Sequence, residues 1–126
     1  MSYQKLAVLA EKLYQKTVAG KIDWEQTASK NTYQAAFSNY TVLVFTQQSR
    51  ENYDDVDYVI SVFNEDGSKI EEFSDVDLSD MGAPLSGESY YQLMKETFEV
   101  ARRHSLGTEK AINEILELLD DSEVPS

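Results

Sequence analysis

The 126-residue chain contains no cysteine and a single histidine. Without cysteine it cannot form disulfides, iron–sulfur clusters, thiolate zinc sites or a cysteine nucleophile. His104 is the only imidazole that could act as a general base near neutral pH. The five glycines are scattered, so no phosphate-binding glycine loop is present. These absences favour a protein that is not an enzyme.

Long apolar runs are also missing. No stretch approaches the ~18 residues of a membrane helix, and the first residues become polar too soon for a signal peptide. We therefore expect a cytoplasmic protein without a membrane partner. The length predicts one domain over residues 1–126, with about 121–126 as a frayed tail.

Positive charge is scarce. The net charge of −12 argues against direct nucleic-acid binding. Residues 1–50 hold six basic and three acidic side chains, whereas residues 51–88 hold twelve acidic ones and only Lys69. Residues 64–80 alone, NEDGSKIEEFSDVDLSD, hold seven carboxylates. The chain thus has a mildly basic first third and a strongly acidic middle.

A first helix is predicted to begin after Ser2, which is a good N-cap, and to end at Gly20. Trp24, just beyond it, is interpreted as a core anchor. The apolar face of this helix is formed by Leu6, Leu9, Ala10, Leu13 and Thr17.

Four strands are predicted next, because the apolar period changes to two near residue 32. Asp66-Gly67 is a hairpin turn signal between the last two strands. The strands are TYQAAF, TVLVFT, DYVISVF and SKIEEF. The last of these is interpreted as an edge strand whose charges oppose aggregation.

A loop over residues 75–87 is predicted to lead into a second helix that starts near Glu88, with Ser86 as its N-cap. Leu106-Gly107 breaks this helix, and Thr108 can cap a short third one. The apolar stripe of the third helix consists of Ile112, Ile115, Leu116 and Leu119.

The predicted fold is therefore α+β: an N-terminal helix, a four-stranded antiparallel meander and two C-terminal helices, with helices covering one face of the sheet. Residues 9–27, 58–73 and 90–119 give the chain this layout. With this layout the chain resembles small uncharacterised bacterial or phage proteins. That resemblance implies the same fold and a prokaryotic or phage setting, and it carries over no site residues.

Asp75, Asp77 and Asp80 form an Asp-x-Asp-x-x-Asp run of the oxygen ligands that calcium and magnesium prefer. The run lacks the mid-loop glycine and late glutamate of an EF-hand, so a solvated loop is the preferred interpretation. A carboxylate-based metal-dependent site is kept as an alternative, and no cofactor is expected. His104 lies near the C-terminus of a predicted helix. A favourable interaction with the helix dipole is the preferred interpretation of this residue, ahead of a catalytic role.

The acidic middle is read first as a solubilising surface. It can also dock on a basic protein, because opposite charge speeds such encounters. Glu71, Glu72, Asp75 and Asp77 are the candidate partner-binding residues. The leading hypothesis is a small acidic cytoplasmic protein that acts through protein–protein contacts. The main alternative is an acidic inhibitor or immunity-type protein on a nucleic-acid-binding partner.

A homodimer through the sheet is also expected. The two strongest strands carry apolar residues on both faces, whereas a sheet with one wet face normally alternates. An uncovered face would bear Leu43, Phe45, Val59 and Phe63. An exposed apolar patch of this kind usually marks an association site, and a twofold dimer is its simplest cover.

Overall fold

The computed structural model describes residues 3–49 and 54–121. The predicted N-cap Ser2 and residues 122–126 of the expected tail lie outside these residues. The elements in chain order are α1 (Tyr3–Val18), β1 (Glu25–Gln26), β2 (Thr32–Phe37), β3 (Tyr40–Gln48), β4 (Val56–Phe63), β5 (Lys69–Ser74), the 3₁₀ turn η1 (Ser79–Met81), α2 (Tyr90–Ser105) and α3 (Thr108–Asp121).

The strands form one antiparallel sheet in the order β1-β2-β3-β4-β5. Each strand pairs with its neighbour in sequence, so the sheet is a meander and the α+β prediction is confirmed. The strand count was wrong by one. Glu25 and Gln26 pair with Tyr33 and Gln34 as a two-residue edge strand. β5 lies at the other edge, as SKIEEF predicted.

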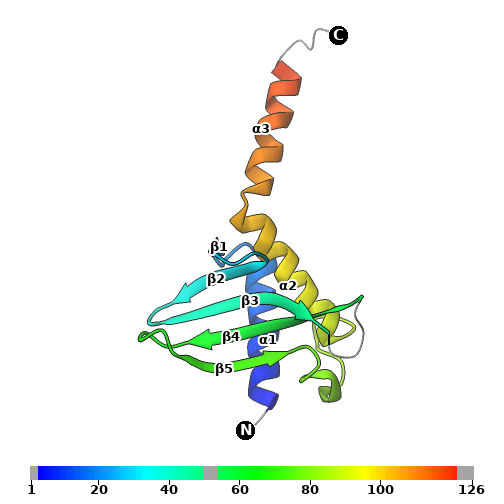
Figure 1. Ribbon diagram of the computed structural model, residues 1–126. Coiled ribbons are helices and arrows are strands. Elements are labelled where there is room, and N and C mark those ends of the chain that lie inside the picture. The colour runs from blue at the N-terminus through cyan, green and yellow to red at the C-terminus, as the bar shows by residue number, and fades with distance from the viewer. Residues whose placement is uncertain (1–2, 50–53, 122–126) are drawn as a thin grey trace.

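Helices α1 and α2 pack side by side on one face of the sheet (Figure 1). Alternate strand residues face these helices and form the core with them. The opposite face, called the outer face below, is covered by no helix in the described part of the chain (Figure 1). Helix α3 extends away from this body instead of covering the sheet (Figure 1).

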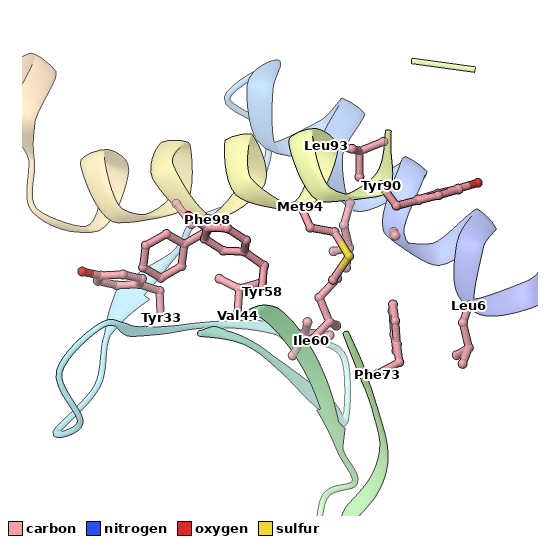
Figure 2. Close-up of a cluster of buried hydrophobic side chains, with 14 of the residues drawn as sticks. Leu6, Tyr33, Val44, Tyr58, Ile60, Phe73, Tyr90, Leu93, Met94 and Phe98 are labelled. Carbon is pink, nitrogen blue, oxygen red and sulfur yellow. The ribbon is translucent and has the colours of Figure 1, made fainter. Parts of the chain in front are cut away.

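Aromatic and aliphatic side chains together fill the space between the sheet and α2 (Figure 2). The rings of Tyr33 and Tyr58 lie 5.5 and 5.6 Å from that of Phe98. Trp24 is 1 % exposed, and its Nε1–H donates to the Thr17 hydroxyl at 3.1 Å. The interpretation of Trp24 as a core anchor is confirmed, and its one polar atom has a partner.

The ends of the helices follow local chemistry. Gly20, at φ +73°, follows α1, and its N–H donates to the carbonyl oxygen of Thr17. Helix α2 begins two residues later than predicted, because Ser89 rather than Ser86 is its N-cap and accepts the N–H of Gln92. None of the described helices is both long enough and apolar enough to span a membrane.

Candidate functional site

The four candidate dimer residues all lie on the outer face, on the central strands β3 and β4. Strand register places Phe45 beside Val59, and Leu43 beside Ser61. Phe63 lies one row further, opposite Thr41. The structure thus brings Leu43, Phe45, Val59 and Phe63 onto one surface that no described helix covers.

This surface is less exposed than the sequence pattern suggests. Val59 is 2 % exposed, because Phe45 and Ser74 flank it on the adjacent strands. Leu43, Phe45 and Phe63 are half-buried. Polar residues alternate with the apolar ones: a single row across the sheet reads Gln34, Leu43, Ser61, Glu72. The outer face is therefore a mixed surface with an apolar centre.

Two of the hollows in the described part of the chain lie on the outer face. One of about 560 Å³ lies near the hairpin turns and includes Leu43 and Phe63 in its lining. The other, of about 280 Å³, lies beside β5 and is lined in part by Asp57, Glu72 and Asp77. The second hollow is the place where acidic side chains converge on the sheet.

Glu72 is the best-positioned acid of this group. Its Oε1 accepts the Ser61 hydroxyl at 2.7 Å and the Lys69 ammonium at 3.0 Å. The hydrogen bond from Ser61 lowers the pKa of Glu72, with a further contribution from Lys69. Glu72 is thus held as a carboxylate at the surface at neutral pH.

Asp75 occupies a different environment. It is 7 % exposed, and its Oδ1 accepts the N–H of Tyr58 at 2.8 Å. Its own N–H donates to the Tyr58 carbonyl oxygen, so Asp75 extends the pairing of β4 and β5. Burial raises the pKa of Asp75, and the carboxylates of Asp57 and Asp77 add to the rise. Its contacts are those of a structural residue.

The other two candidate partner-binding residues, Asp77 and Glu71, lie on different sides of the sheet. Asp77 accepts the backbone N–H of Ser74 at 2.9 Å while lining the acidic hollow. Glu71 pairs with Val62 and lies on the helix-facing side of β5, opposite Glu72. Of the four predicted partner-binding residues, the structure brings Glu72 and Asp77 together, buries Asp75 and turns Glu71 away.

The three aspartates that suggested a metal site do not act together in the structure. Asp75 and Asp77 accept backbone N–H groups of two different residues. Asp80 lies in the 3₁₀ turn η1. Within residues 3–49 and 54–121, no three His, Asp or Glu side chains are grouped so that they could hold a metal ion.

His104 lies in the last turn of α2, as its sequence position indicated. Its Nε2 lies 3.0 Å from Oδ1 of Asp23, and both side chains are exposed. Arg103, beside it, pairs with Glu109 at the start of α3. These contacts connect the end of α2 to the segment between α1 and β1 and to the start of α3.

Helix α3 is the feature whose role sequence reasoning missed. Its apolar stripe was recognised, but the stripe was expected to pack on the body. Every residue from Glu109 to Asp120 is exposed. Five large aliphatic side chains are between 42 % and 68 % exposed: Ile112, Ile115, Leu116, Leu118 and Leu119. An amphipathic helix of 14 residues thus stands without a partner.

Comparison with protein-family models, curated proteins and solved structures found no match.

Proposed function

We propose that this chain is a small, acidic, non-enzymatic protein that acts by binding another protein, with α3 as its main binding element. The observation that carries the proposal is the exposure of every residue from Glu109 to Asp120 on an amphipathic helix. Surface helices of folded proteins normally bury their apolar stripe. Here the stripe is presented to solvent, where a partner can cover it.

Energetics favour a covered state of α3. A helix of about 14 residues is marginal in water without packing. Full burial of an aliphatic side chain contributes about 1.5–3 kcal/mol, so five half-exposed ones offer about 5 kcal/mol in total. That gain opposes the entropy cost of association.

A second candidate function, an acidic inhibitor of a basic protein, is favoured by the 280 Å³ hollow that Asp57, Glu72 and Asp77 line. The lowered pKa of Glu72 keeps charge there. If a basic partner docks on this hollow, its association should slow as salt rises. Asp57→Asn combined with Glu72→Gln should also slow it. A rate that neither salt nor these substitutions change would remove this candidate.

The outer face carries the proposed homodimer contact, because Leu43, Phe45 and Phe63 lie there without a covering helix. A twofold dimer would bury this apolar centre against itself. The proposed setting for both kinds of contact is the cytoplasm, which agrees with a chain that contains no cysteine.

The main proposal is tested by capture from extracts of the source cells with three full-length baits. These are the wild type, Ile115→Lys in the apolar stripe, and Asn113→Lys on the polar side of α3. The two variants introduce the same residue and the same charge two positions apart. A protein captured by the wild type and Asn113→Lys is then purified, and its affinity for all three baits is measured by calorimetry.

We expect Ile115→Lys to weaken that affinity at least tenfold, because it places an ammonium group in the contact. Affinities that are equal for Ile115→Lys and Asn113→Lys would show that α3 is not the binding element.

A further inference from the structure

The shape and charge of α3 identify the kind of surface that it fits. This inference rests on the proposed function and makes its partner specific. We propose that α3 docks lengthwise into an apolar groove of another protein, and that the rims of this groove carry lysine and arginine. The width of the apolar stripe and the charges on its two borders carry the argument.

The apolar stripe is too wide for a contact with a single helix. At about 100° per residue, the apolar side chains cover an arc of about 160° around α3. They are Ala111, Ile112, Ile115, Leu116, Leu118 and Leu119. The seam of a two-stranded coiled coil uses a narrower stripe. A groove with two walls covers an arc of this width, as in other helix-in-groove complexes.

Acidic residues border the stripe on both sides. Asp120 lies next to Leu116 on one border, and Glu114 lies next to Leu118 on the other. Glu109 also lies beside Leu116, but its charge is paired with that of Arg103. The one basic residue of α3, Lys110, is on the side opposite the stripe. Both borders that meet the rims of a groove are therefore negative.

The C-terminal end of α3 adds to this negative potential. Its last turn holds no basic residue, although the carbonyl groups of a helix C-terminus favour one. Basic rims on the partner would supply the missing positive charge along the borders and at this end.

A second copy of α3 is the competing occupant, and the same borders oppose it. Packing two stripes together would bring Glu114 and Asp120 of one helix near the acids that border the stripe of the other. Like charges placed across an interface disfavour it. A basic groove therefore fits this helix better than another copy of the chain.

The test uses two synthetic helical hairpins with the same leucine-lined groove, one with lysine and one with glutamate along both rims. Their affinities for the full-length protein are measured by calorimetry at low and high salt. We expect the lysine-rimmed hairpin to bind at least tenfold more tightly than the glutamate-rimmed one. This preference should shrink as salt rises. Ile115→Lys should lose the binding, and Asn113→Lys should retain it.

A variant with reversed charge on the borders of the stripe tests the role of charge directly. Glu114→Lys combined with Asp120→Lys reverses the charge on both borders and leaves the stripe intact. This variant should prefer the glutamate-rimmed hairpin. Because these positions are exposed, circular dichroism should show an unchanged fold. Equal affinity for both hairpins, a preference that does not reverse, or failure of both hairpins to bind would overturn the inference.

Sedimentation of the hairpin-free protein tests the competing occupant. Self-association at neutral pH that Ile115→Lys abolishes would assign α3 to a second copy and overturn the basic groove. The proposed function fails by a different result, namely cellular partners that bind equally well to Ile115→Lys and Asn113→Lys. The two failures are therefore distinguishable.

Discussion

Two replacements of Asp75 should separate a structural role from a docking role. The Asp75 carboxylate is buried and accepts the N–H of Tyr58 at 2.8 Å. Asparagine presents an oxygen to the same N–H and carries no charge. Alanine presents no acceptor and leaves the Tyr58 N–H without its side-chain partner. The comparison of Asp75→Asn with Asp75→Ala therefore isolates the hydrogen bond.

The expected magnitudes follow from these contacts. A buried donor left without a partner costs about 1–3 kcal/mol, so Asp75→Ala should lower the free energy of unfolding by that amount. Asp75→Asn exchanges a charged acceptor for a neutral one but removes a buried charge near Asp57 and Asp77. We expect it to stay within about 1 kcal/mol of the wild type. For a domain of this size, 1 kcal/mol corresponds to about 4 °C in Tm.

The pH dependence of the Asp75 contribution has a definite sign. Burial raises the pKa of Asp75 in the folded state above its ordinary 3.8, so the folded chain holds this proton more tightly than the unfolded chain. The stability contribution of Asp75 therefore falls as pH rises from about 3.8 through the raised pKa. The difference in free energy of unfolding between Asp75→Asn and the wild type should therefore be most favourable to the variant at a pH above the raised pKa. As pH is lowered through the raised pKa, the wild type gains stability from the bound proton and the variant does not.

Glu72 provides a control of opposite sign. Its pKa is lowered below the ordinary 4.5 by the Ser61 hydroxyl. Its contribution is present above 4.5 and is lost as pH falls through the lowered pKa. Glu72→Gln should therefore cost stability at neutral pH and converge on the wild type in acid. Because the Glu72 side chain is 37 % exposed and solvent screens its contacts, the effect should be small.

Urea unfolding followed by the fluorescence of the single, buried Trp24 measures these free energies across pH. The structural account of Asp75 would be refuted if the alanine and asparagine variants were equally stable. It would also be refuted if Asp75→Asn kept full stability but lost a measured protein partner, because that result would make Asp75 a docking residue.

Three further predictions concern the body of the protein. Trp24→Phe should cost about 1–2 kcal/mol in urea unfolding followed by circular dichroism, because it removes the indole donor to the Thr17 hydroxyl; an unchanged midpoint would contradict that interpretation. His104→Gln should cost at most about 1 kcal/mol, since its contact with Asp23 is exposed, and a larger loss would argue against a surface role. Light scattering should give a mass above 14.3 kDa that Phe45→Glu returns to the monomer value; a wild type that stays at 14.3 kDa at every concentration would exclude the dimer.

The sequence predicted most of the fold, because periodicity and turn chemistry are local. The branched and aromatic residues of DYVISVF marked β4, and Asp66-Gly67 marked the hairpin before β5, where Gly67 has φ +83°. β1 escaped prediction because two residues are too few to show a period. Ser86 and Ser89 are both acceptable N-caps by sequence, and only the structure distinguishes them.

The candidate surfaces were less predictable, because they depend on the arrangement of whole elements. The two-residue period of side chains along β3 and β4 predicted which residues share the outer face, but it did not show that α1 and α2 leave that face uncovered. The acidic composition did not distinguish buried Asp75 from exposed Glu72. The stripe on α3 specified an apolar contact, and an apolar stripe by itself does not identify what covers it.

Removal of α3 provides a final test of how the body and the helix divide their tasks. Since the residues from Glu109 to Asp120 are all exposed, a chain that ends at Gly107 keeps the whole hydrophobic core. It should unfold within about 1 kcal/mol of the full chain, because the Arg103–Glu109 pair is an exposed contact of small value. Urea unfolding and the Trp24 emission spectrum measure this directly. A shortened chain that unfolds or aggregates would mean that α3 packs on the body in solution, and the stripe would then be part of the core rather than a binding element.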